Sequence, residues 1–164
     1  MSVKKLTRIS LLTAIALIIF IIELRIPDIV PIPGVKLGLA NIVTVYAMYS
    51  YSPKETLMIL SVRILLGSVF SGNISSIIYS LSGALLCFCG MLVLKHITDK
   101  KYIWLCSIIG AVLHNTGQIL TAVIVMKTTA VLTYFPFLIV SGCIAGAFTG
   151  ICTQVLISRI NFTE

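Results

Sequence analysis

The chain has 164 residues, of which 59% are hydrophobic and 10% are charged, and its mean hydropathy is +1.12. A soluble domain carries about 25% charged residues, so this composition leaves too little charge to cover a surface that faces water. The sequence therefore predicts an integral membrane protein. No segment between the apolar runs is long enough to form a separate soluble domain.

The formal net charge of +7 comes from 12 Lys and Arg residues against 5 Asp and Glu residues. In a soluble protein, such an excess favours nucleic-acid binding. Here the basic residues flank apolar runs, which is typical of residues that set membrane topology, so we expect no nucleic-acid partner. The five cysteines lie inside apolar runs without a CxxC pair, which indicates packing residues instead of disulfides or a metal site.

Six apolar runs separated by short polar breaks predict an all-α integral membrane bundle of six transmembrane helices. Unbroken apolar runs without alternating polarity exclude a β-barrel, the other architecture that spans lipid. We expect a single transmembrane domain. Its spans cover about residues 9–24, 36–52, 54–70, 74–94, 102–126 and 131–158.

The positive charges predict the orientation of this bundle. With the N-terminus in the cytoplasm, the cytoplasmic ends carry eight basic residues and the outer ends carry three. The eight are Lys4, Lys5, Arg8, Lys54, Lys95, Lys100, Lys101 and Arg159, and the three are Arg25, Lys36 and Lys127. We therefore expect a multi-pass protein of the cell membrane with both termini cytoplasmic. No small-residue cleavage pattern follows the first apolar run, so we expect an uncleaved first helix.

The longest predicted outer segment, residues 25–34, follows Glu23 at the end of the first span. Its three prolines restrict its conformations, so it is either a stiff lid over an external pocket or a rigid connector. If it is a lid, we expect Pro33, Gly34 and Lys36 to lie beside the pocket, with Glu23 in a supporting position.

Arg63 lies near the middle of the third span, nine residues after Lys54 and seven before Phe70. Burial of a charged side chain at this depth costs free energy, so a structural or functional role is expected for it. It either satisfies backbone carbonyls or pairs with a carboxylate such as Glu23, or it contacts a ligand, and these roles are compatible. A ligand with an anionic group suits Arg63 or Lys36.

The fifth span carries a polar cluster, in which His114 and Gln118 share one helix face and Asn115 is adjacent. Such a cluster is either an interhelical hydrogen-bond clamp or a ligand site. Other polar residues fall at the same predicted depth in the outer half, which is the pattern expected for a cavity inside a bundle. The predicted ligand contacts are Asn41, Arg63, Tyr79, His114, Asn115, Gln118 and Tyr134.

Small residues predict where helices pack or partners dock. Gly142, Gly146 and Gly150 form a GxxxGxxxG ridge on the sixth span, which allows another helix to approach closely. Ser10 and Ala14 form a weaker small-xxx-small pair on the first span.

Motifs of several enzyme classes are absent from the sequence. The only aspartates, Asp28 and Asp99, cannot form the DDxxD motif of magnesium-dependent diphosphate chemistry. GxxxxGK[ST], HExxH and GxSxG are also missing, and the two histidines have no Cys/His metal spacing. We therefore expect no enzyme activity, no cofactor and no metal.

Five blocks occur in order along the chain: PGVKLGLAN at 33–41, RILLG at 63–67, YSLSG at 79–83, HNTGQ at 114–118 and YFP at 134–136. Together they resemble the Gx transporter family, which is also labelled heptaprenyl diphosphate synthase component I. The resemblance covers most of the chain, from Glu23 to about Gly150, and the first and fourth blocks together make it specific.

Members of that family resemble the substrate-binding S components of energy-coupling factor (ECF) transporters. The resemblance implies a six-helix bundle whose ligand site opens outward, with a transmembrane coupling subunit and a pair of cytoplasmic ATPases as partners. Where S components carry an AxxxA motif in the first helix, this chain has Ser10-x-x-x-Ala14.

Two functions follow from the residues and the resemblance. The first is a membrane transport protein that captures a small organic ligand of a vitamin-like, isoprenoid or quinone-precursor class from the outer side, for ATP-driven uptake by its partners. The alternative is a noncatalytic membrane subunit of a polyprenyl (heptaprenyl) diphosphate synthase, with a prenyl synthase as its partner.

Overall fold

The computed structural model of the protein describes residues 2–25, 38–72 and 76–160. Within these ranges the chain forms six α-helices and two short 3-10 helices, and no strand. The α-helices are α1 (Val3–Arg25), α2 (Asn41–Ser50), α3 (Pro53–Phe70), α4 (Ser76–Ile97), α5 (Ile103–Met126) and α6 (Phe135–Arg159). The predicted all-helical architecture is confirmed.

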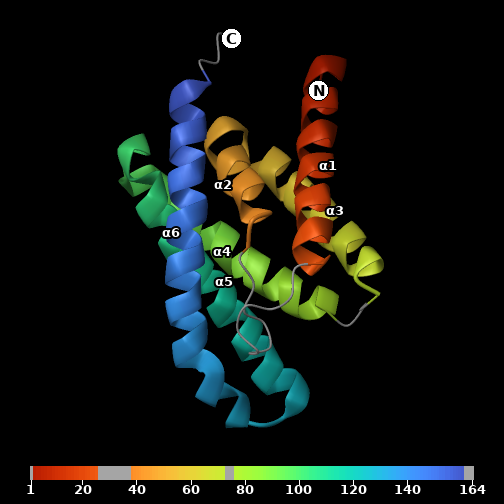
Figure 1. Ribbon diagram of the computed structural model, residues 1–164, viewed down its shortest axis with the longest axis vertical. Helices are drawn as coiled ribbons and strands as arrows, with labels where there is room; N and C mark the ends of the chain where they lie inside the picture. The colour runs from red at the N-terminus through yellow and green to blue at the C-terminus, as the bar shows by residue number, and fades with distance from the viewer. Residues whose placement is uncertain (1, 26–37, 73–75, 161–164) are drawn as a thin grey trace.

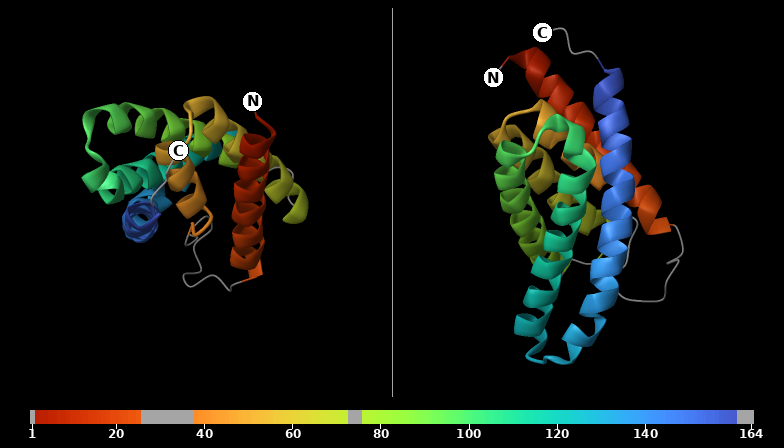
Figure 2. Two further views of the ribbon diagram at one scale, coloured as in Figure 1. Left: turned by 90° about the horizontal axis from the view of Figure 1, so that it is seen from above. Right: turned by 90° about the vertical axis from the view of Figure 1, so that its left-hand side faces the viewer.

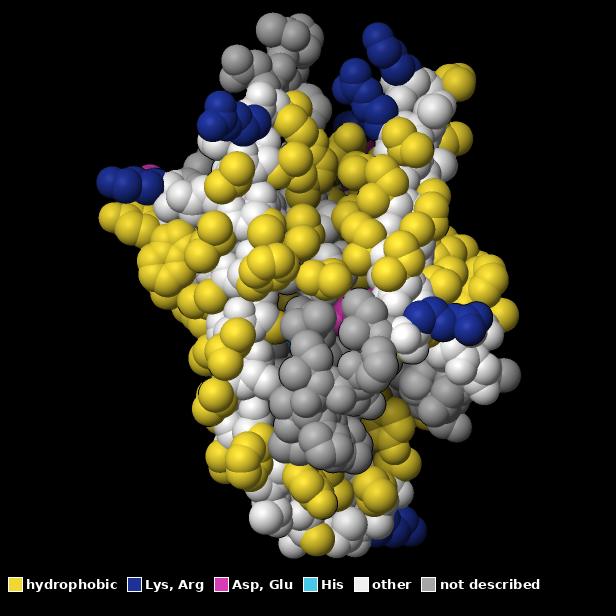
Figure 3. Space-filling view, in the orientation of Figure 1, with side chains coloured by type: hydrophobic (Ala, Val, Ile, Leu, Met, Phe, Trp, Pro, Cys, Tyr) yellow, Lys and Arg dark blue, Asp and Glu magenta, His cyan; other side chains and the backbone are white. Residues whose placement is uncertain are grey.

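Four segments of the described chain are long and apolar enough to cross a membrane: α1, α4, α5 and Ala130–Arg159, in which the 3-10 helix η2 (Ala130–Tyr134) precedes α6. Hydrophobic side chains cover most of the face shown in Figure 3, and Lys and Arg side chains gather mainly at the end where α1 begins and α6 ends (Figures 1 and 3). These features support a multi-pass membrane protein. The cell membrane as its location, and cytoplasmic termini, stay predictions.

The helix α2 differs from the expected second span, 36–52. It has 10 residues and begins at Asn41, five residues after the expected start. The physical reason is Gly38, whose φ of +66° is a left-handed conformation that interrupts a right-handed helix. Residues 38–40 therefore form a turn that leads into α2. The expected start of this helix was wrong.

The chain reverses sharply between α2 and α3. Pro53 occupies the first turn of α3, where its missing N–H costs no helical hydrogen bond. The backbone N–H of Ser52 donates to the carboxylate of Glu55 over 3.0 Å, which closes a capping box. Glu55 also pairs with Lys5 over 2.7 Å and so fixes the start of α1 beside the start of α3.

The bundle consists of two sets of three helices. The first set consists of α4, α5 and α6, and α5 packs between the other two (Figures 1 and 2). The second set consists of α1, α2 and α3, and in it α1 packs mainly on α3. The two sets meet where α2 contacts α6 and α3 contacts α4. The start of α1 and the end of α6 lie at the same end of the molecule (Figure 1). This arrangement leaves a seam between the sets.

Buried apolar side chains fill the half of the bundle nearer the start of α1 and the end of α6. One cluster joins α2, α3, α4 and α5, and a smaller one joins α1, α2 and α3. The first consists of Val45, Met48, Leu60, Ile64, Ala84, Phe88, Met91 and Ile103, and the second of Ile9, Ala47 and Ile59. The cavity described next lies in the other half.

Candidate ligand-binding site

A cavity of about 440 Å³ lies on the seam between the two helix sets. All six α-helices and the turn before α2 contribute to its wall. This volume falls within the usual range for small-molecule sites, about 300–1,000 Å³. The lining residues are Phe20, Glu23, Leu24, Gly38, Ala40, Asn41, Arg63, Ile64, Gly67, Ser68, Ser71, Ser76, Tyr79, Ser80, Ala111, His114, Asn115, Gln118, Ser141, Gly142 and Ala145.

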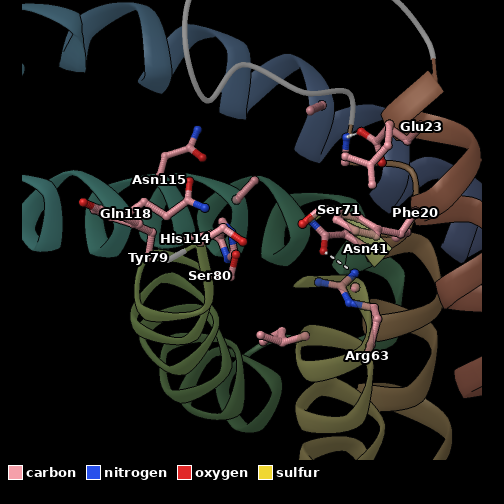
Figure 4. A pocket seen from close by; sticks show the side chains of 18 of the residues that line it. Phe20, Glu23, Asn41, Arg63, Ser71, Tyr79, Ser80, His114, Asn115 and Gln118 are labelled. Atoms are coloured by element: carbon pink, nitrogen blue, oxygen red, sulfur yellow. Dashed lines mark hydrogen bonds between the residues drawn. The ribbon is translucent and has the colours of Figure 1, made fainter. Parts of the chain in front are cut away.

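The cavity brings together most of the polar residues that the sequence singled out. Six of the seven predicted contacts line it, namely Asn41, Arg63, Tyr79, His114, Asn115 and Gln118, and so does the predicted supporting residue Glu23. Figure 4 shows them in two groups. Tyr79, Ser80, His114, Asn115 and Gln118 come from α4 and α5, whereas Phe20, Glu23, Asn41, Arg63 and Ser71 lie on the other side.

Tyr134 is not among the residues that line the cavity. It lies at the end of η2 with 49% of its surface exposed. The reason is the length of α5, which continues to Met126, about two turns beyond Gln118, before the chain turns back. The expected contact between Tyr134 and a ligand in this cavity is therefore not supported by the geometry. Pro33, Gly34 and Lys36, the expected lid residues, lie outside the described residues.

Four residues form a hydrogen-bonded chain that joins α1, the turn, the start of α2 and α3. The guanidinium Nη1 of Arg63 donates to the side-chain oxygen of Asn41 over 3.2 Å. The backbone N–H of Asn41 donates to the carbonyl of Gly38 over 2.8 Å, and the N–H of Gly38 donates to the carboxylate of Glu23. The left-handed turn at Gly38 thus places Asn41 between the cation and the carboxylate (Figure 4).

One of the roles considered for Arg63, a direct pair with Glu23, is absent from the structure. Among the described residues, the ion pair found within 4.0 Å is Lys5–Glu55. Glu23 and Arg63 still interact electrostatically, but the hydrogen bonds that they make go to Gly38 and Asn41. Sequence reasoning could not find this arrangement, because it predicted a helix where the structure has the turn.

The polar cluster on α5 serves two purposes. The amide nitrogen of Asn115 donates to the carbonyl of Leu138 over 2.6 Å, so Asn115 joins α5 to α6 while it also lines the cavity. His114 and Gln118 lie against Gly83 of α4: a Cβ added there would meet the His114 carbonyl oxygen at 2.7 Å and the Gln118 Cγ at 2.8 Å. Asn115 therefore acts as an interhelical clamp, and the role of this cluster in ligand binding stays a prediction.

Several lining residues were not among the predicted contacts. They include Phe20, Ser68, Ser71 and Ser80. A signal for Ser71 was available, because Arg63, Gly67 and Ser71 are spaced i, i+4 and i+8 and so share one face of α3. Phe20 carries no such signal, since an apolar residue in an apolar helix reads as lipid-facing or core. Its ring lies against Gly67, where a Cβ would meet it at 2.9 Å.

The glycine ridge on α6 faces α5. Cβ atoms added at Gly146 and Gly150 would fall 2.7 Å from the Cα of Ile108 and 2.6 Å from the Cα of Trp104. The ridge is therefore occupied within this chain, which leaves it unavailable to a partner. Ser10 and Ala14 both lie exposed on α1.

The composition of the cavity wall defines what it can do chemically. Its described part contains one cation, Arg63, one carboxylate, Glu23, and otherwise neutral hydroxyl, amide, imidazole and apolar groups. Within residues 2–25, 38–72 and 76–160, no group of three or more His, Cys, Asp or Glu side chains is placed to hold a metal ion. Such a wall suits hydrogen bonding to a small polar molecule.

Comparison with known proteins gives one result. The family model described as heptaprenyl diphosphate synthase component I matches residues 12–156. No curated protein and no solved structure matches the chain. The matched range includes α2 to α5, most of α1 and α6, and all described residues of the cavity. The chain therefore belongs to the heptaprenyl diphosphate synthase component I family.

Proposed function

We propose that this protein is a membrane transport subunit that captures a small organic ligand in the cavity between its two helix sets, in the manner of an ECF S component. The observation that carries this proposal is the cavity itself. Polar side chains are costly inside a membrane protein, and here six helices direct them toward one space of ligand size. A purely structural bundle has no need of such a space.

The predicted topology gives this site a direction. The start of α1 and the end of α6 carry positive charges that assign them to the cytoplasmic side. The cavity lies in the opposite half of the bundle, which is therefore the outer half. In this proposal the protein is not an enzyme, it binds its ligand from outside the cell membrane, and a coupling subunit with two cytoplasmic ATPases supplies the energy for uptake.

Binding by the purified protein tests the site. His114→Ala and Gln118→Ala remove polar groups from the cavity wall, and Tyr134→Ala removes one outside it. Native mass spectrometry of each variant measures how much small molecule stays bound after purification. We expect the first two variants to lose most of the bound molecule and Tyr134→Ala to retain it. Equal occupancy in all three would refute the site.

The description of the family favours a second candidate, a noncatalytic membrane subunit of a polyprenyl diphosphate synthase. The two candidates predict different partners. Affinity purification from membranes, followed by protein mass spectrometry, should recover a transmembrane coupling subunit and ATPases under the first. Recovery of a prenyl diphosphate synthase, with a change in its rate or product length on reconstitution, would support the second instead.

A further inference from the structure

The two charged groups of the cavity are held apart. Arg63 and Glu23 both line it, yet they make no ion pair within 4.0 Å. Each hydrogen bonds to a neutral group instead, Glu23 to Gly38 in the turn and Arg63 to Asn41 at the start of α2. The wall therefore presents a positive and a negative group as separate features. A ligand that complements both groups carries a negative charge at the position that faces Arg63. At the position that faces Glu23 it carries either a positive charge or a hydrogen-bond donor.

Arg63 is the stronger of the two recognition groups. A guanidinium has five N–H donors in a planar fork that matches a carboxylate or phosphate. Among the described residues, Asn41 is the acceptor that Arg63 uses, and that acceptor is uncharged. A cation with a neutral partner in a membrane interior is stabilised by an anion that enters the cavity.

Glu23 is buried, with 7% of its surface exposed, and one of its oxygens accepts the N–H of Gly38. A carboxylate has acceptor capacity on both oxygens, so a further donor is suited to it. The remaining polar lining residues, which include Tyr79, His114 and Gln118, are neutral. The described wall thus has no formal net charge when Arg63 and Glu23 are ionised.

This balance of charge restricts the ligand. A diphosphate brings several negative charges, and the described wall offers one cation beside a carboxylate. In a medium of low dielectric, the uncompensated charge is costly. We propose, on the basis of the transport function above, that the cavity binds a carboxylic acid that also carries an amine or amide N–H group, with the carboxylate at Arg63 and the N–H group at Glu23, and that it does not bind prenyl diphosphates.

The test uses the molecule that the wild-type protein carries through purification in mild detergent. High-resolution mass spectrometry of the released molecule gives its elemental composition, and coupling to an amine with a carbodiimide detects a carboxylate. We expect one carboxylate, at least one N–H group and no phosphorus. Farnesyl diphosphate serves as the second probe, and we expect it not to displace the bound molecule. These measurements need no variant and so do not depend on the folding of one.

Matched variants then test the two contacts. Arg63→Gln and Glu23→Gln remove the charges, whereas Arg159→Gln and Glu55→Gln make the same changes away from the cavity. We expect occupancy to fall about tenfold or more in the first pair, as for loss of a charge-assisted hydrogen bond, and to persist in the second. The primary amide of the identified acid should bind wild-type protein about tenfold more weakly than the acid.

The outcomes separate this inference from the proposed function. A released molecule that contains phosphorus or lacks a carboxylate, or displacement by farnesyl diphosphate, overturns the inference and leaves ligand capture intact. Occupancy that persists in folded Arg63→Gln does the same. Wild-type protein that carries no small molecule contradicts the proposed function itself.

Discussion

Asn41 accepts a hydrogen bond from Arg63 over 3.2 Å, although the two residues lie 22 positions apart at the start of α2 and in the middle of α3. The contact joins the turn at Gly38 to the cationic side of the cavity. It also supplies the acceptor that Arg63 uses within the described part of the chain.

Replacement of Asn41 should therefore destabilise the bundle. We expect Asn41→Ala to lower the free energy of unfolding by about 2 kcal/mol, because a hydrogen bond to a charged group is lost in a partly buried site. Titration of the detergent-solubilised protein with sodium dodecyl sulfate measures this change. Asn41→Asp is the matched control, since it keeps the acceptor and adds an ion pair. If Asn41→Ala unfolds at the same concentration of sodium dodecyl sulfate as the wild-type protein, the contact contributes nothing to the free energy of unfolding.

The close approach of α4 and α5 gives a second prediction. A Cβ at Gly117 would lie 2.8 Å from the backbone of Gly83 and Ser82, so Gly117→Ala must push the helices apart. We expect a loss of about 1–3 kcal/mol, as for overpacking in other proteins.

Gly90→Ala provides a matched control for Gly117→Ala on the same helix pair. The Cβ there would meet the end of the flexible Leu113 side chain at 2.1 Å, and that side chain can move away. The same titration should show a smaller effect for Gly90→Ala than for Gly117→Ala. The reverse order would show that the backbone contact at Gly83 does not set the helix spacing.

A third prediction concerns the hydrogen bond between Ser107 of α5 and Thr149 of α6. The two hydroxyl oxygens lie 3.0 Å apart and both side chains are buried. A double-mutant cycle with Ser107→Ala and Thr149→Val isolates their interaction. We expect a coupling energy of about 0.6 kcal/mol, the average for interhelical hydrogen bonds in membranes. Strictly additive effects of the two substitutions would contradict it.

The predicted orientation is tested by cysteine labelling. In a variant whose five native cysteines are replaced by alanine, Thr129→Cys lies between α5 and η2, and Lys101→Cys lies between α4 and α5; both native side chains are exposed. We expect a membrane-impermeant maleimide to label Thr129→Cys in intact cells and Lys101→Cys only after permeabilisation. The opposite pattern would place the cavity on the cytoplasmic side.

Much of the polar lining of the cavity could be predicted because polar residues are rare in this chain. His114, Asn115 and Gln118 stand out in an apolar run, and so does Arg63. Their cost in a membrane makes each one informative. Phe20 and Ser68 line the same cavity but could not be found in this way, since apolar and small hydroxyl residues are common throughout membrane helices.

The composition by itself determined that this is a membrane protein, because 10% charged residues cannot cover a water-facing surface. The unbroken apolar runs determined that its spans are helices. Only the tertiary structure decided how the rare charges are used. The sequence placed Arg63 near the middle of the third span and Glu23 at the end of the first, and it offered a direct pair between them as one of several roles for Arg63. The left-handed turn at Gly38 instead gives each of them a neutral partner, and it keeps both charges on the wall of the cavity. That outcome depends on how separate helices pack, which no local pattern records.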